Sequence, residues 1–168
     1  MRTPATPSAR PQDATQLLMA DHRELEQLFA LYATLSQAGE ADRKMLVAAQ
    51  ICVALEMHMR IEEEILYPAA RRALADKDQA VVDEAVVEHA GARALVGQVK
   101  EMASDAPLVD AKLKVLSEYV THHVDEEEHE FFPKVRRTAI DLVELGRQLA
   151  ARRQELLTAV RPGPGAGA

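Results

Sequence analysis

The sequence of 168 residues contains little cysteine, glycine, proline or aromatic side chain. A single cysteine, Cys52, excludes a disulfide within the chain and a site built from several thiolates, so a bound metal would need nitrogen and oxygen ligands. Tryptophan is absent, and there are 3 Tyr, 3 Phe, 7 Gly and 8 Pro. Because Pro and Gly gather near both ends, we expect flexible tails at 1–11 and 161–168 around one folded domain at 12–160.

Basic charge and long apolar runs are also scarce. The chain has 20 Lys and Arg against 27 Asp and Glu, and no basic stretch is dense enough to follow a phosphate backbone, so we expect no nucleic acid partner. The longest apolar runs last about five residues, whereas roughly 20 are needed to cross a bilayer, so we expect no membrane partner. The Pro-rich residues at the N-terminus lack the apolar core of a secretory signal, which favours a cytoplasmic protein.

The residues between the two tails favour helix at nearly every position. They are rich in Ala, Leu, Glu, Gln, Arg and Met, which are strong helix formers, and strand signals are close to absent. Leu18, His22, Leu25 and Phe29 recur at the three- and four-residue spacing of an amphipathic helix. Short links between four long helices indicate an all-α fold, an up-down-up-down four-helix bundle with an additional C-terminal helix. The predicted helices are 13–37, 40–74 with a perturbation at Pro68, 78–103, the segment from the turn at 104–107 to 132, and 138–160.

One sequence pattern occurs twice. Residues 58–68 (HMRIEEEILYP) align without a gap with residues 123–133 (HVDEEEHEFFP), and each copy has His, Glu four residues later, and an aromatic residue before a proline. The two halves of the chain therefore look like one helical hairpin used twice. An acidic residue followed by His also precedes each copy, with its His 36 residues before the first and 34 before the second, at Asp21-His22 and Glu88-His89.

Each copy of the pattern places an imidazole and a carboxylate on the same helix face. Residues four apart in a helix lie about 6 Å apart along the axis, so His58 pairs with Glu62 and His123 with Glu127. Both carboxylates have apolar neighbours at helical spacing, which predicts that they face the core. A buried carboxylate is costly unless it is paired or bound to a cation, and the cost arises in both halves.

His22 and His89 also lie on apolar helix faces, so one His from each of four helices and one Glu from each of two should converge. Four neutral imidazoles and two carboxylates suit two divalent ions joined by an oxo, hydroxo or carboxylate bridge. Iron is the most natural occupant of such a site with open positions, although zinc and manganese accept the same ligands. The candidate metal ligands are His22, His58, Glu62, His89, His123 and Glu127.

The register of the second copy leaves an alternative open. His122 lies four residues before Glu126, so a shift by one residue would make these two the ligands. The alignment at Pro133 and the apolar neighbours favour His123. His129 is expected to face solvent.

Other residues near the predicted site have two interpretations each. Tyr119 lies one turn before His123, either as a core tyrosine or with its phenol close to the metals. Glu63 and Glu128 belong to a solvated face, but they could also accept hydrogen bonds from ligand imidazoles. Ferritin-like di-iron bundles carry Glu-x-x-His, whereas His comes first here with a spacing of four, which argues against that class.

Taken together, the two His-x3-Glu motifs and the two upstream histidines resemble the hemerythrin-like (HHE cation-binding) family of non-haem di-iron proteins. The resemblance covers roughly residues 13 to 135. It implies a four-helix bundle, two iron ions held by the six residues named above, and an open position at which dioxygen or another small diatomic or peroxide ligand binds. The oxygen carriers of this family have an additional His one turn after the first His of the third helix, and here that position is Arg93.

The missing imidazole implies more open iron positions, which shifts the expected chemistry from reversible oxygen carriage towards oxidation, peroxide or nitric oxide reactions. Two other interpretations remain: an iron- or oxygen-responsive regulatory module without turnover, and a zinc-loaded or purely structural bundle. The C-terminal helix is compatible with a monomer or a homodimer.

Overall fold

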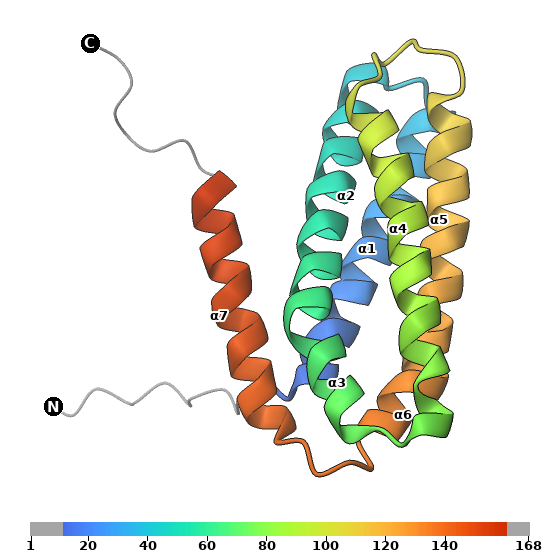
Figure 1. The fold of residues 1–168 in the computed structure, drawn as a ribbon. Helices are drawn as coiled ribbons and strands as arrows, with labels where there is room; N and C mark the ends of the chain where they lie inside the picture. Colours follow the sequence, from blue (N-terminus) through green and yellow to red (C-terminus); the bar gives the residue numbers. More distant parts are fainter. Residues whose placement is uncertain (1–11, 161–168) are drawn as a thin grey trace, which may run out of the picture.

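The computed structural model describes residues 12–160, so the predicted tails at 1–11 and 161–168 lie outside the described residues. As predicted, the described part is helical, with four long helical segments running up and down beside one another and a further helix at the C-terminal end (Figure 1). The first segment is α1 (Ala14–Gln37). The second comprises α2 (Ala41–Ile61), the π-helical turn η1 (Glu62–Leu66) and α3 (Tyr67–Ala73).

A short 3-10 turn, η2 (Asp76–Asp78), leads into the second hairpin. Its first segment is α4 (Ala80–Lys100), and its second comprises α5 (Val109–Glu126), the π-helical turn η3 (Glu127–Phe131) and α6 (Phe132–Val135). The last helix is α7 (Leu142–Val160). Among residues 12–160, no helix is long and apolar enough to span a membrane.

Local signals set the ends of α1. Asp13 accepts a hydrogen bond from the backbone N–H of Gln16, and the Gln16 side chain accepts one from the backbone N–H of Asp13, which forms a complete capping box. After the helix, Gly39 adopts φ 73°, a left-handed conformation that glycine reaches at low cost. This end follows the sequence-based prediction closely.

Each proline of the repeat follows a π-helical turn. The N–H of Tyr67 bonds to the carbonyl of Glu62, and the N–H of Phe132 bonds to the carbonyl of Glu127, so each turn spans five residues instead of four. Proline removes one backbone donor and crowds the carbonyl four residues earlier, and the wider turn lets the helix continue past it. Each π-helical turn begins at the Glu of the His-x3-Glu motif. The helix perturbation expected at Pro68 therefore begins at Glu62, one of the predicted metal ligands.

The start of the last helix differs from the sequence-based prediction, which placed it at residue 138. It begins at Leu142 because the Asp141 carboxylate accepts from the backbone N–H groups of Val143 and Glu144. Thr138 instead donates its hydroxyl to the carbonyl of Val135 and closes the preceding helix.

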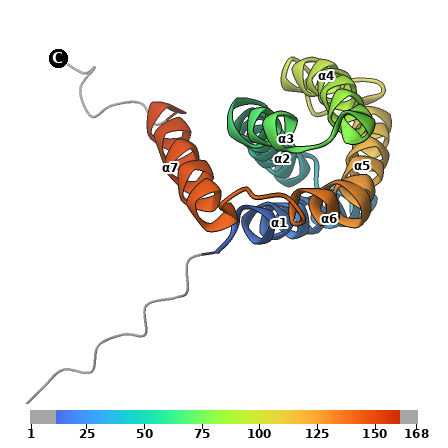
Figure 2. The same cartoon turned by 60° about the horizontal axis from the view of Figure 1, so that its bottom comes forward.

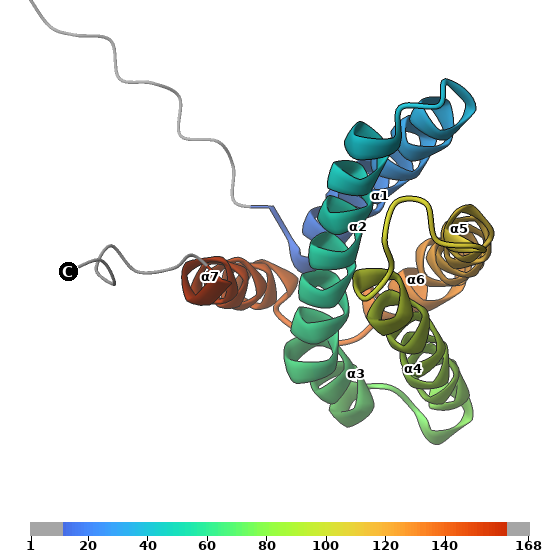
Figure 3. The ribbon, with the colours of Figure 1, turned by 90° about the horizontal axis from the view of Figure 1, so that it is seen from above.

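Helix α7 packs against the outside of the first hairpin, at the side formed by α1 and α2 (Figures 2 and 3). Leu145, Leu149 and Leu156 are its buried residues. Gly146 permits the close approach, since a Cβ atom at this position would lie 2.5 Å from the carbonyl oxygen of Gln12.

The apolar core consists of two clusters with a polar layer between them. One cluster lies towards the proline-containing ends and includes Leu18, Ile61 and Phe131, and the other occupies the opposite half of the bundle and includes Leu25 and Leu55. Eight polar or charged residues are buried within 12–160, and six of them are the predicted metal ligands. Burial of so many ionisable groups in one layer requires a compensating interaction.

Candidate metal centre

The structure brings all six predicted ligands together in this polar layer. His22 comes from α1, His58 from α2, His89 from α4 and His123 from α5, and each is at most 6% exposed. Glu62 and Glu127 begin the two π-helical turns and are 0% and 2% exposed. All six residues therefore face one another in the interior, His123 and Glu127 included.

The six residues form two imidazole pairs with the carboxylates between them. The ring centroids of His22 and His58 are 4.9 Å apart, and those of His89 and His123 are 4.7 Å apart. Glu62 Oε2 lies 3.2 Å from Nε2 of His58 and 3.4 Å from Nε2 of His89. Glu127 Oε2 likewise lies 3.4 Å from Nε2 of His22 and 3.7 Å from Nε2 of His123. Each carboxylate thus reaches both imidazole pairs.

These spacings match those of ligand atoms around metal ions. Two atoms that each lie ~2.1 Å from one ion are separated by ~3.0–3.4 Å. One group of atoms within 4.8 Å of one another comes from His22, His58, Glu62 and Glu127, and a second comes from Glu62, His89 and His123. Two adjacent positions that share carboxylates fit a dinuclear centre.

Several buried atoms of the centre have no hydrogen-bond partner. They are Nε2 of His22, both ring nitrogens of His58, both carboxylate oxygens of Glu62 and Oε2 of Glu127. Buried polar groups in proteins are normally hydrogen-bonded, and the unpaired atoms here, apart from the outer Nδ1 of His58, lie on side chains that face one another, which indicates a place for an ion. The donor set of imidazole nitrogen and carboxylate oxygen therefore fits divalent transition metals.

The proton affinities of the centre reflect the burial of charge. Burial, with the neighbouring Glu127 carboxylate, raises the pKa of Glu62 well above its usual value. Burial acts to raise the pKa of Glu127, but the imidazoles of His123 and His22 have the larger effect. The pKa of Glu127 is therefore lower than its usual value. Burial and the nearby imidazoles lower the pKa of His58 well below its usual value, which keeps this ring neutral and able to ligate.

A second layer of carboxylates faces the outer nitrogens of the four rings. Nδ1 of His22 lies 2.8 Å from Glu128, Nδ1 of His89 lies 3.0 Å from Glu63, and Nδ1 of His123 lies 2.7 Å from Glu88. An ionised carboxylate only accepts hydrogen bonds, so each ring donates from Nδ1 and directs the lone pair of Nε2 inwards.

His58 has its outer carboxylate at a greater distance. Its Nδ1 lies 3.6 Å from Asp21, which is hydrogen-bonded to Arg153 of α7. Asp21 and Glu88 were not identified as partners from the sequence, although each directly precedes a candidate ligand in the repeat. That shared position was the signal that could have revealed them.

Tyr67 also lies in the centre, a position that its place before Pro68 in the sequence does not by itself indicate. Its hydroxyl donates to Glu127 Oε1 at 3.1 Å and lies 3.2 Å from Nε2 of His89, inside the centre. Burial, then the nearby carboxylates, raises the pKa of Tyr67 well above 10, so the phenol keeps its proton. At the equivalent position of the second repeat, Phe132 stacks on His22 with ring centroids 5.9 Å apart. The two halves therefore differ by one hydroxyl.

Several other candidates lie outside the buried cluster. His122, His129 and Tyr119 are 65%, 75% and 45% exposed. Arg93, one turn after His89, points to the surface and forms an ion pair with Glu63 at 2.7 Å. It therefore steadies the carboxylate that holds His89 and does not enter the centre.

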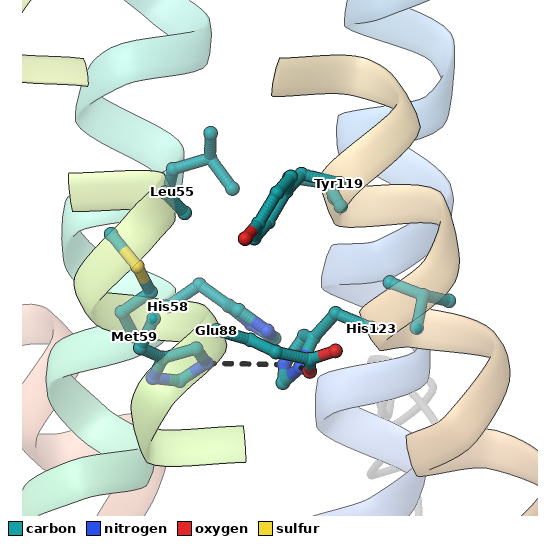
Figure 4. Close-up of a pocket in the computed structure, with 10 residues that line it drawn as sticks. Leu55, His58, Met59, Glu88, Tyr119 and His123 are labelled. Carbon is teal, nitrogen blue, oxygen red and sulfur yellow. Dashed lines mark hydrogen bonds and ion pairs between the residues drawn. The ribbon is translucent and has the colours of Figure 1, made fainter. Parts of the chain in front are cut away.

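A small apolar cavity adjoins the centre (Figure 4). It has a volume of about 10 Å³, room for one water-sized molecule. His58 and His123 line one side of it, and Leu55 and Tyr119 lie on the other side, as Figure 4 shows. Tyr119 fits here because α4 has Gly91 beneath its ring, where a Cβ atom would lie 3.2 Å from Cε1 of the tyrosine.

The fold and the site together define a class of protein, an antiparallel helical bundle with a His- and Glu-rich metal-type cluster in its core. The model of the hemerythrin HHE cation binding domain family matches residues 13–135. The chain belongs to this family, as the repeated His-x3-Glu motifs indicated.

Two known proteins are similar to the chain. A DNA nickase from Nostoc sp. is 28% identical over 120 residues, and this match spans 71% of the chain but only 32% of the nickase. The crystal structure of a hemerythrin HHE cation binding domain-containing protein from Mycobacterium kansasii has a TM-score of 0.70 with 20% identity, over 88% of this chain and 89% of the other. The second match shows that the fold is shared.

Proposed function

We propose that this protein holds two iron ions in its centre and binds or reacts with dioxygen or a related small oxidant such as peroxide or nitric oxide. The observation that carries the proposal is the set of buried nitrogen and oxygen atoms of the centre that lack hydrogen-bond partners. His22 and His58 would hold one ion, and His89 and His123 would hold the other. Glu62 and Glu127 lie within reach of both and supply the negative charge that two cations require.

Iron, when bound, supplies open coordination positions and electrons for a small oxygen-containing ligand. The residues around the centre fix its geometry. Glu128, Glu63 and Glu88 hold the outer nitrogens of three ligand rings, which orients those rings and raises their basicity. The apolar clusters on both sides exclude bulk water from the polar layer.

Tyr67 makes the two halves of the centre chemically unequal. Its hydroxyl holds a proton beside Nε2 of His89, whereas Phe132 offers no proton beside His22. The one proton of this hydroxyl is donated to Glu127 Oε1, so a small ligand near His89 would accept it in place of Glu127, whereas a ligand near His22 would meet only an apolar ring. This asymmetry favours reaction at the half formed by His89 and His123.

The cavity that adjoins the centre offers a place for a small ligand. It has room for one water-sized molecule beside His58 and His123. Gly91 allows Tyr119 to lie against α4 beside the cavity. A wider surface pocket reaches His22 and Glu128 on another side of the centre.

The experiment that tests the proposal is an anaerobic Fe(II) titration of the metal-free protein, followed by admission of air while the visible spectrum is recorded. We expect two iron ions per chain and new oxygen-dependent charge-transfer bands. His58→Ala should lower the iron content, whereas His129→Ala, an exposed His on the same chain, should leave it unchanged. Binding of no iron, or of one iron without an oxygen-dependent band, would contradict the proposal.

Two contacts of α7 favour a second function, an iron- or oxygen-responsive regulatory module without turnover. Arg153 of α7 is hydrogen-bonded to Asp21, which faces His58. Arg152 forms an ion pair with Glu64 in η1. A change at the centre would therefore reach the position of α7. Hydrogen exchange of residues 142–160 with and without iron tests this: faster exchange in one state supports the regulatory function, and equal exchange contradicts it.

A further inference from the structure

One histidine-containing cluster lies outside the buried centre, on the outer side of the second hairpin. It consists of Glu88 on α4 and of His122 and Glu126 on α5. His122 Nε2 lies 3.5 Å from Glu88 Oε1 and 3.3 Å from Glu126 Oε1. The side chains are 65%, 13% and 30% exposed for His122, Glu88 and Glu126, so an ion in solution can reach the cluster.

The distances within this cluster are those expected around one ion. Two ligand atoms of a tetrahedral zinc site, each ~2.1 Å from the metal, are ~3.4 Å apart. The two measured separations, 3.5 Å and 3.3 Å, lie on either side of that value. One imidazole and two carboxylates leave a fourth position for water, which is a common arrangement for a divalent transition metal.

The charges of the cluster also favour a cation. Over residues 12–160, neither Glu88 nor Glu126 forms an ion pair with a lysine or arginine. The basic side chains that they contact there are His122 and His123. Other carboxylates near the centre do have such partners, as in the pairs of Glu63 with Arg93 and of Glu64 with Arg152. A divalent ion would supply the missing positive charge.

We infer that Glu88, His122 and Glu126 form a surface site for one divalent transition-metal ion, separate from the buried centre. The site is joined to the centre through Glu88. Its Oε1 faces His122, and its Oε2 lies 2.7 Å from Nδ1 of His123. An ion bound at the surface withdraws electron density from Glu88 and weakens it as a hydrogen-bond acceptor for His123. Occupancy of the surface site therefore changes the hydrogen bond of a residue in the buried centre.

The test uses Zn(II) and the full chain after treatment with a chelator. Equilibrium dialysis gives the number of zinc ions per chain for the wild type and for three variants. His122→Ala and Glu126→Gln should each bind one ion fewer than the wild type. His129→Ala is the matched control, because His129 is an exposed residue near the same end that pairs with Asp125 four residues earlier at 3.0 Å but has no third ligand. It should bind as many ions as the wild type.

The count by difference separates this inference from the proposed function. If the wild type binds one zinc ion and His122→Ala binds none, the surface site exists and the buried centre does not take up zinc, while the Fe(II) titration described above remains the test of the proposed function. Equal stoichiometry and affinity in the wild type and His122→Ala would overturn the surface site, whatever the centre binds. An equal loss in His129→Ala would also overturn it, because exposed histidines would then bind zinc without a built site.

A second measurement tests the connection between the two sites. In protein with 15N-labelled histidine, the last equivalent of zinc should shift the resonance of His122 Nε2 and, by a smaller amount, that of His123 Nδ1. Both shifts should disappear in Glu126→Gln. A shift at His122 without any change at His123 would overturn the connection through Glu88.

Discussion

Replacement of Asp21 by asparagine should change the pH dependence of the stability of the metal-free protein. Asp21 is 15% exposed, lies 3.6 Å from Nδ1 of His58 and is bonded to Arg153. Burial raises the pKa of Asp21 from 3.8 to about 6, although Arg153 acts in the opposite direction. A carboxyl group with a raised pKa binds its proton more tightly in the folded chain than in the unfolded one. Its contribution to stability is therefore complete below pH 3.8 and is lost as the pH rises through about 6.

The size of the effect follows from these two values. A shift of roughly two pKa units corresponds to about 3 kcal/mol of unfolding free energy over the whole titration. The part that falls between about pH 5 and about pH 8 is roughly 1.4 kcal/mol by the same linkage relation. The amide of Asp21→Asn does not titrate, so the wild type should lose this amount relative to the variant over that interval.

Urea unfolding of chelator-treated wild type and Asp21→Asn at several pH values measures the difference directly. Groups whose titration does not depend on residue 21 cancel in that difference, which therefore reports on Asp21 and the imidazoles coupled to it. Arg153→Gln removes the guanidinium that lowers the pKa of Asp21, so in that variant the loss of stability should move to higher pH. A difference between wild type and Asp21→Asn that stays constant from pH 5 to pH 8 would refute the assignment of Asp21 as a buried carboxyl with a raised pKa.

Four further substitutions give three separate tests. Glu62→Gln should leave the melting temperature of the metal-free protein near pH 7 almost unchanged, because burial already favours a neutral side chain, while iron binding is lost; a large fall in melting temperature would contradict this. Asp110→Ala should cost about 2 kcal/mol in urea unfolding, because the ammonium group of Lys44 loses both carboxylate oxygens at 2.9 Å. Gly146→Ala should lower the melting temperature, because the added Cβ would contact the backbone before α1. Gly97→Ala has nothing within 4 Å of the added Cβ and should stabilise its helix by up to about 1 kcal/mol. The same change of melting temperature in both variants would refute the packing argument.

The helices of this protein are predictable from the sequence because their signals are local. The capping box of Asp13 and Gln16 and the turn at Gly39 depend only on neighbouring residues, and the structure has both. The convergence of His58 and Glu62 is predictable for the same reason, since a spacing of four fixes two side chains on one helix face. The family is predictable because the repeated motifs resemble it. The start of α7 is later than the sequence predicts, because Thr138 closes the preceding turn instead of beginning the helix.

The partners within the centre depend on contacts between distant parts of the chain. The sequence contains two aromatic residues at equivalent positions, but only the packing of the hairpins places the Tyr67 hydroxyl 3.1 Å from Glu127, 60 residues away, and stacks Phe132 on His22.

The sequence by itself determined the helices and the six residues that face the core, because periodicity of 3.6 residues and spacing of four are properties of a single helix. It indicated the family through the resemblance of its repeated motifs. Only the tertiary structure decided that Glu88 divides its two oxygens between His123 and His122, and that Arg153 of the last helix reaches Asp21. Those contacts join helices across the fold, and their geometry depends on how the helices pack, which residue spacing within one helix does not encode.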